Sequence, residues 1–160
     1  MRRARKLHGL PPELAATDHL GKQLDRKRAQ AALAEWRVRH PALDLVLVEG
    51  NHDVHAGAPD AALGITLVNA PLIDGPFALC HHPIEFADKY VLAGHLHPAY
   101  RLAGRRDCVR LPCFWFGPEV GVLPAFGDFT GAHAITPQPG DRVFVVADDR
   151  VLAVPARRAA

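Results

Sequence analysis

Apolar residues recur with a helical period in one segment near the start of the chain. Pro41 ends the pattern, because proline disfavours helical backbone in the residue before it. The sequence therefore predicts one amphipathic helix over residues 22–40. The positions that share its apolar face are Ala29, Ala32, Leu33, Trp36 and His40.

Downstream of this helix, short apolar runs separated by glycine and proline predict strands. The first run, residues 43–48, is rich in branched apolar side chains and is followed by Glu49 and Gly50, as is typical of a buried strand. Many strands beside few helices predict an α+β domain whose sheets pack face to face with helices outside. The further predicted strands are residues 65–68, 77–80, 90–93, 100–103, 108–116, 120–125, 142–147 and 151–154.

The composition fits one folded domain. The chain has 160 residues, of which 49% are hydrophobic and 22% are charged, as in soluble globular proteins. No apolar run approaches the roughly 18 residues of a membrane-spanning helix, and the basic start is followed by Gly9 and prolines instead of a signal-peptide core. We therefore expect a cytoplasmic protein with no membrane contact, built from a loose leader (1–16), one domain (17–155) and a frayed tail (156–160).

Several kinds of chemistry are excluded by residue counts. The sequence contains no serine, which excludes a serine nucleophile. Its three cysteines include no CxxC pair, so neither a disulfide framework nor a cysteine zinc site is indicated, and a reducing compartment fits best. The net charge of +2 is too small to identify a nucleic-acid-binding protein by itself.

Chemically active side chains follow three of the predicted strands. After the first strand, the carbonyl oxygen of Asn51 is a potential metal ligand, His52 can donate a proton and Asp53 can orient its ring. Such residues also occur in ordinary turns, so the segment alone does not decide between the two interpretations.

The other two segments contain pairs of histidines. His81 and His82 follow the strand at residues 77–80, while His95 and His97 follow the strand at residues 90–93. On extended backbone, residues two apart project to one face, so His95 and His97 form half of a metal site, and Gly94 permits close backbone approach. Any one segment alone is equally consistent with packed or surface histidines.

The order and spacing of the three segments resemble the calcineurin-like metallophosphoesterase superfamily. The resemblance implies that superfamily's β-sandwich flanked by helices, and two divalent metal ions, with Mn²⁺ expected first and Fe or Zn as alternatives. It further implies a general-acid or phosphate-contacting role for His52, with Asp53 orienting it. His81 is preferred to His82 because the superfamily's ligand follows the strand directly. The implied metal ligands are Asn51, His81, His95 and His97.

Further segments are similar to the bacterial ligase-associated DNA damage response endonucleases of the PdeM type. These segments are residues 94–99, 110–115, 123–127 and 129–131, and the resemblance covers about residues 36–154. It implies a metal-dependent phosphodiesterase or endonuclease that acts on a phosphodiester such as DNA. It also implies a functional association with an ATP-dependent DNA ligase and a helicase in DNA repair.

The sequence departs from that family near its start. The family has a first-strand Asp-x-His and a second-strand Gly-Asp, and neither motif is intact here. Asp18 is the only candidate for the bridging carboxylate, yet residues 10–16 contain two prolines and do not predict a buried strand. We therefore expect an N-terminally truncated domain whose activity is weakened, because neutral ligands alone hold two divalent ions poorly.

Two other functions remain open at this point. One is a catalytically dead remnant that acts as a binding or interaction module. The other is a mononuclear zinc or iron protein that uses His81, His95 and His97. Four arginines are candidates for phosphate contacts, although solvated loop charges are the commoner case. They are Arg101, Arg105, Arg106 and Arg110.

Overall fold

The structure is a computed structural model, and it describes residues 23–51, 59–104, 108–126 and 131–155. Three of the expected site residues lie outside these ranges, namely Asp18, His52 and Asp53. Arg105, Arg106, the expected leader and the expected tail lie outside them as well.

The predicted helix is confirmed as α2 (Gln23–Arg39). Trp36 on its apolar face is buried, with 3% of its surface exposed. At the end of the helix, the guanidinium of Arg37 donates hydrogen bonds to the carbonyl oxygens of His40 and Leu43, at 2.9 and 2.6 Å. These bonds satisfy carbonyl groups at the point where the chain leaves the helix. No described helix is both long enough and apolar enough to cross a bilayer.

Each predicted strand is present, with ends that differ from the prediction by a few residues. The sequence did not predict β3, β9 or the short helix η1 (Ala61–Leu63), because two or three residues are too few to show a period. The strands are β1 (Leu45–Val48), β2 (Ile65–Val68), β3 (Leu72–Asp74), β4 (Phe77–Cys80), β5 (Tyr90–Ala93), β6 (Pro98–Ala103), β7 (Cys108–Phe116), β8 (Val120–Val122), β9 (His133–Ala134), β10 (Arg142–Ala147) and β11 (Arg150–Ala153).

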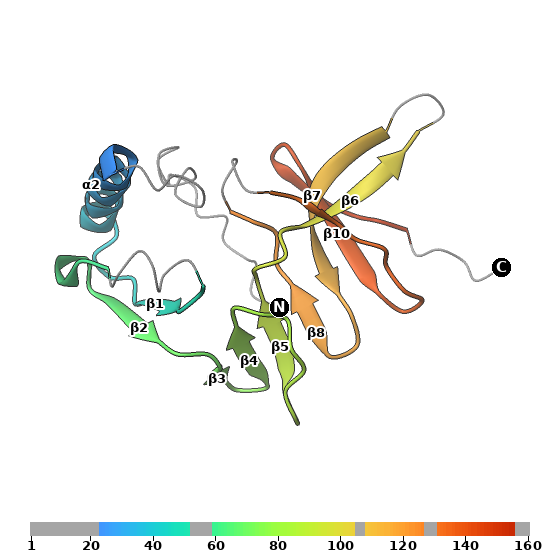
Figure 1. The fold of residues 1–160 in the computed structure, drawn as a ribbon, viewed down its shortest axis with the longest axis horizontal. Helices are drawn as coiled ribbons and strands as arrows, with labels where there is room; N and C mark the ends of the chain where they lie inside the picture. The colour runs from blue at the N-terminus through green and yellow to red at the C-terminus, as the bar shows by residue number, and fades with distance from the viewer. Residues whose placement is uncertain (1–22, 52–58, 105–107, 127–130, 156–160) are drawn as a thin grey trace.

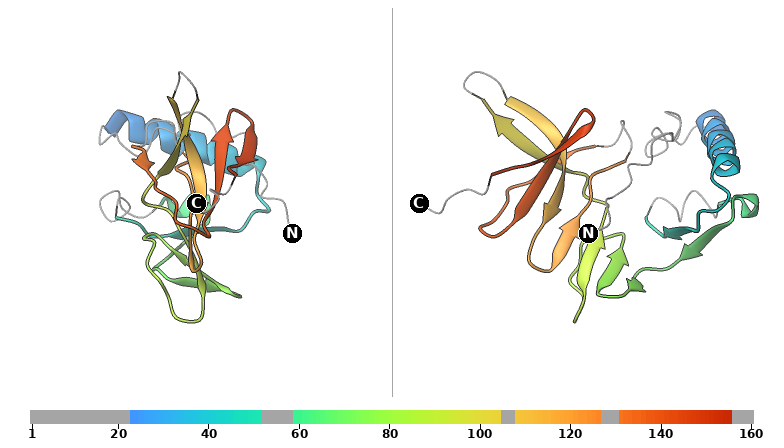
Figure 2. Two further views of the ribbon diagram at one scale, coloured as in Figure 1. Left: turned by 90° about the vertical axis from the view of Figure 1, so that its right-hand side faces the viewer. Right: turned by 180° about the vertical axis from the view of Figure 1, so that it is seen from behind.

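The strands form two sheets. β1 and β2 pair in parallel as a two-stranded sheet, and the other nine strands form a mixed sheet in the order β11-β10-β7-β8-β5-β4-β3, with β6 joined to β7 and β9 joined to β6. Within it, β4, β5 and β8 run parallel. The α2–β1–β2 unit lies beside the large sheet along the long axis of the molecule (Figures 1 and 2).

The predicted α+β class agrees with this sheet-rich architecture, but face-to-face packing is not confirmed. In the described residues the two sheets lie side by side, and apolar side chains on the small sheet remain exposed, including Val46 of β1 and Leu67 of β2. A parallel pair of strands is normally covered on both faces. The calcineurin-like sandwich therefore stays a prediction.

Two buried clusters stabilise the large sheet. Alternate residues of β4 and β5 form the first, and β7 and β10 with Ile135 supply the second. The alternation follows from the two-residue period of a strand. The first cluster contains Ala78, Cys80, Val91 and Ala93, and the second contains Cys113, Ile135, Val143 and Val145. The first cluster fixes the pair of strands whose ends carry the histidines.

Candidate metal centre

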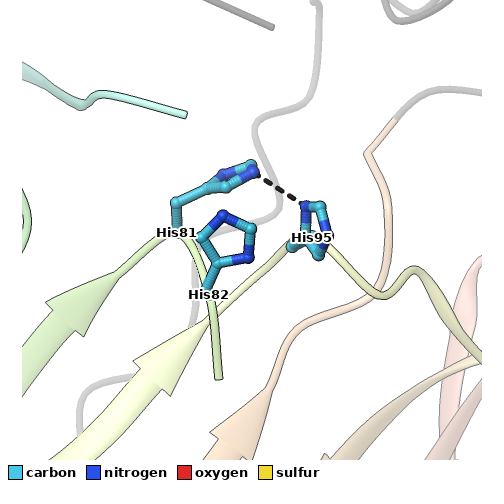
Figure 3. A group of neighbouring side chains, drawn as sticks. All are labelled: His81, His82 and His95. Atoms are coloured by element: carbon cyan, nitrogen blue, oxygen red, sulfur yellow. Dashed lines mark hydrogen bonds between the residues drawn. The ribbon is translucent and has the colours of Figure 1, made fainter. Parts of the chain in front are cut away.

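The carboxyl ends of β4 and β5 bring the histidine segments together. The two strands are parallel and in register, with Cys80 paired to Ala93. The next residues therefore leave the sheet at the same edge, where the Gly94 amide donates a hydrogen bond to the carbonyl oxygen of His81 at 3.2 Å. His95 follows directly, and its ring faces that of His81 (Figure 3).

The segment that carries His95 and His97 is not extended, so the prediction that both rings project to one face of a strand is wrong. Both residues have left-handed backbone, with φ angles of 63° and 50°. The Leu96 amide donates to the Gly94 carbonyl oxygen at 2.7 Å, which closes a three-residue turn centred on His95. Left-handed backbone in residues other than glycine is uncommon and costs about 1–3 kcal/mol where it is strained, and it clusters at ligand sites.

Three side chains meet at the end of β4. Nε2 of His81 lies 2.6 Å from Oδ1 of Asn51 and 2.9 Å from Nδ1 of His95. Asn51 comes from the segment after β1, so this contact connects the small sheet to the large one. All three residues are among the metal ligands that the family resemblance implied, and the structure brings them together.

The two contacts compete for one hydrogen. The amide oxygen of Asn51 only accepts, so its hydrogen bond with His81 requires the hydrogen on Nε2. Nδ1 of His95 must then also act as an acceptor towards the same N–H. Oδ1 of Asn51 and Nδ1 of His95 thus both point a lone pair at Nε2 of His81. A cation bound between them would accept lone pairs from all three atoms.

His82 joins the same group, although the sequence favoured His81 alone. One ring nitrogen from each of His81, His82 and His95 lies within 4.8 Å of the other two. The rings of His82 and His95 are 4.2 Å apart at their centroids, and Figure 3 shows all three rings facing one another. His82 is exposed, whereas His81 and His95 are half-buried. Among the described residues, the group contains no carboxylate.

His97 lies outside this group of three. Its Nδ1 is 3.2 Å from the carbonyl oxygen of Gly131, in the segment that leads to β9. That contact orients the ring and leaves Nε2 as its second potential ligand atom. The left-handed turn at His95 is the physical reason that the two neighbouring histidines separate.

Gly50 is a site residue that the sequence identified only as the end of a strand. A Cβ at this position would lie 2.5 Å from Nδ1 of His81, closer than real side chains approach. Only glycine therefore allows the backbone after β1 to pack against the imidazole ring. The sequence shows a glycine immediately before Asn51. It does not show that this glycine contacts His81, because the two residues are 31 positions apart.

Burial favours the thiol form of the two buried cysteines, Cys80 and Cys113. Burial raises the pKa of the Cys113 thiol to about 11, and burial also raises the pKa of Cys80. Cys80 precedes His81 in the chain, but it belongs to the buried cluster between β4 and β5. The thiol form is favoured in both places, because a buried thiolate loses its hydration.

Comparison with known proteins finds a nuclease with a similar fold. The structure matches the crystal structure of Pseudomonas putida nuclease MPE with a TM-score of 0.71 and 44% sequence identity. The match covers 79% of this chain and 61% of that nuclease, so the chain spans about three-fifths of the nuclease's length. No family model and no curated protein matches the chain. The described fold is therefore nuclease-like.

The donor set at the end of β4 fits a transition metal. Imidazole nitrogens suit zinc, iron and other divalent metals, and a carbonyl oxygen extends the range to manganese. Two imidazole nitrogens on one ion, each at about 2.0–2.1 Å from it, lie about 2.9 Å apart in an octahedral arrangement and about 3.3 Å apart in a tetrahedral one. The separation of 2.9 Å between His81 Nε2 and His95 Nδ1 agrees with the octahedral arrangement.

Proposed function

We propose that this chain is a metal-dependent phosphodiester hydrolase with nuclease-like activity. The observation that carries the proposal is the convergence of Asn51, His81 and His95 on one point, at 2.6 and 2.9 Å around Nε2 of His81. The similarity to Pseudomonas putida nuclease MPE supports a nucleic acid as substrate. Hydrolysis of DNA in repair, together with a ligase and a helicase, is the more specific form of this proposal.

In this proposal, Asn51, His81, His95 and His97 hold two divalent ions, with Mn²⁺ as the preferred metal. Divalent ions at such a centre neutralise phosphate charge and activate water for attack on phosphorus. His82 lies close enough to replace or supplement His81 as a ligand. Asp18 is the proposed carboxylate of the centre, and it would supply negative charge that the described ligands lack.

His52 and Asp53 complete the proposed reaction. His52 delivers a proton to the leaving oxygen, and Asp53 holds the imidazole in the required orientation. Both residues follow directly after Asn51 in the chain, and the side chain of Asn51 contacts His81. The metal ligands alone would not deliver this proton, so the proposal assigns the step to His52.

A second candidate function is a binding module with a single metal ion and no catalysis. The observation that favours it is the neutral character of the group, because the described ligands are imidazoles and one amide. Three histidines bind one zinc or iron ion well without any carboxylate. Two ions bring four positive charges together and require more negative charge than these groups offer.

Metal stoichiometry and hydrolysis together test the proposal. The purified chain is loaded with Mn²⁺, its bound metal is measured, and hydrolysis of bis(p-nitrophenyl) phosphate and of single-stranded DNA is followed. We expect His95→Ala to lose both metal and hydrolysis, while the matched control His133→Ala, an exposed histidine on β9, retains both. One bound ion and no hydrolysis in the unmodified chain would favour the binding module. Hydrolysis that survives His95→Ala and chelation would contradict a metal-dependent reaction.

A further inference from the structure

Two arginines face each other across the β6–β7 hairpin. Arg101 of β6 pairs with Arg110 of β7 in the antiparallel register, and both side chains are exposed. Residues directly opposite in such a pair project from the same face, with Cβ atoms about 4.5–5.5 Å apart. Like charges in this position repel and destabilise the hairpin. The pair by itself therefore opposes folding, and a bound anion would relieve the repulsion.

Nothing in the described structure neutralises the pair. Neither guanidinium forms an ion pair or a hydrogen bond with another described residue. The two side chains line a surface depression of about 340 Å³ together with Cys108 and Ala134. Ala134 belongs to β9, which pairs with β6 through Ala99. Among the described residues that line the depression, the two arginines are the charged groups.

The opposite face of the hairpin explains why the arginines stay exposed. Leu102 and Leu111 pack against the buried cluster around Cys113. Because side chains alternate along a strand, Arg101 and Arg110 must then project away from that cluster. The hairpin thus has one packed apolar face and one basic face.

The strand that carries Arg101 begins directly after the segment that contains His95 and His97. β6 begins at Pro98, directly after His97, and it leads away from the carboxyl end of β5 (Figure 1). Arg101 lies four residues beyond His97, which corresponds to about 13 Å of extended strand. A stacked nucleic-acid strand advances about 3.4 Å per nucleotide, so about four nucleotides would span the distance from His97 to Arg101.

We propose that Arg101 and Arg110 bind the sugar-phosphate backbone of a nucleic-acid strand whose scissile bond lies at the histidine group. This inference rests on the proposed function and names two residues that position its nucleic-acid substrate. A phosphate between the two guanidinium groups removes their repulsion, and each guanidinium can donate paired hydrogen bonds to phosphate oxygens. Backbone contacts of this kind position a strand without reading its bases.

Binding in the absence of metal tests the arginine pair independently of hydrolysis. Fluorescence anisotropy with a labelled single-stranded DNA oligonucleotide, in the presence of EDTA, compares the unmodified chain with the double variant Arg101→Gln/Arg110→Gln. We expect the affinity to fall by about tenfold or more, and the slope of log K against log salt to decrease by about two. The matched control is Arg150→Gln, an exposed arginine on β11, which we expect to bind like the unmodified chain. Unchanged affinity and salt slope in the double variant would overturn the inference.

Hydrolysis then separates a failure of this inference from a failure of the proposed function. We expect the double variant to lose more kcat/KM on the oligonucleotide than on bis(p-nitrophenyl) phosphate, which is too small to reach from the histidines to the arginines. An equal loss on both substrates, or a loss of the circular dichroism of the folded chain, would show a structural role and overturn the inference. Arginine-dependent DNA binding with no hydrolysis of either substrate would support the basic face and overturn the proposed function.

Discussion

The side-chain oxygen of Asn51 lies 2.6 Å from Nε2 of His81, although the two residues are 30 positions apart and belong to segments that follow different sheets. This contact joins the segment after β1 to the end of β4. It also places an amide oxygen and a ring nitrogen where one ion can contact both. The geometry at this contact leads to predictions for binding, catalysis and stability.

Asn51→Asp should strengthen metal binding. The described ligand group contains no carboxylate, so a carboxylate at this exposed position adds direct Coulomb attraction to a divalent ion. We expect Mn²⁺ affinity to rise by about tenfold, equivalent to about 1.4 kcal/mol, whereas Asn51→Ala should lower it. Isothermal titration calorimetry measures both. Equal affinities in the two variants would show that the residue at position 51 does not contact the ion.

Gly50→Ala should disrupt the site while a nearby glycine tolerates the same change. A Cβ at Gly50 would lie 2.5 Å from the His81 ring, whereas a Cβ at Gly94 would meet nothing within 4 Å. We expect Gly50→Ala to move His81 and lower metal affinity at least tenfold, because displaced ligands no longer converge. Gly94→Ala should leave metal affinity within about twofold of the unmodified chain, since no clash opposes it. Similar losses in both variants would contradict a specific role for the approach of Gly50.

His52→Ala should reduce hydrolysis without removing metal. The proposed role of His52 is proton delivery, which typically contributes about 100-fold or more to a rate. We therefore expect turnover of a phosphodiester with a poor leaving group to fall by about 100-fold, with unchanged metal stoichiometry. A substrate with a nitrophenolate leaving group needs less protonation and should be affected less. Parallel loss of metal and activity would identify His52 as a ligand instead.

The three cysteines should differ in their reactivity towards a thiol reagent. Cys108 is exposed, whereas Cys113 is fully buried and burial raises its pKa to about 11. The thiolate is the reactive form, so at pH 8 Cys113 is both covered and protonated. We expect one fast thiol, which Cys108→Ala removes, and slow reaction of Cys113 that accelerates in denaturant. Fast labelling of Cys113 in the folded chain would contradict the packing of β7 against β10.

The same pKa shift predicts a loss of stability in alkali. The folded state holds the Cys113 proton more tightly than the unfolded state, whose thiol has a pKa near 9.0. This group therefore leaves stability unchanged below pH 9 and lowers it as the pH rises from about 9 towards 11. Urea denaturation at a series of pH values measures the effect. The alkaline loss should be smaller in Cys113→Ala, compared with that variant's own stability at pH 7.

Asp141→Ala should destabilise the large sheet without affecting the metal site. The carboxylate of Asp141 accepts hydrogen bonds from Nε1 of Trp115 at 2.7 Å and from the Gln138 amide at 2.8 Å. Loss of this acceptor leaves a half-buried indole N–H without its partner, at a cost of about 1–3 kcal/mol. Urea denaturation should show a lower midpoint with an unchanged slope. Metal affinity in native conditions should not change, because Trp115 lies on β7, which β8 separates from β5 in the sheet.

The sequence by itself determined most of the secondary structure of the chain. The helical period around Trp36 and the apolar runs bounded by glycine and proline predicted α2 and nine of the strands, because these signals depend on neighbours in the chain. The resemblance of these segments to the metallophosphoesterases implied that Asn51, His81, His95 and His97 share one metal site, and the structure brings the first three together. Residues at the carboxyl ends of parallel strands share an edge of the sheet, as Cys80 and Ala93 show.

Only the tertiary structure decided which side chains meet. The left-handed turn at His95 separates His97 from the group, and the exposed His82 joins it. The close approach of Gly50 to His81, and the pairing of Arg101 with Arg110, depend on register between distant segments. Local sequence patterns report the period of a single element. Contacts between elements arise from packing and hydrogen-bond pairing between residues far apart in the chain. Such contacts cannot be recognised from the residues that flank them in the sequence.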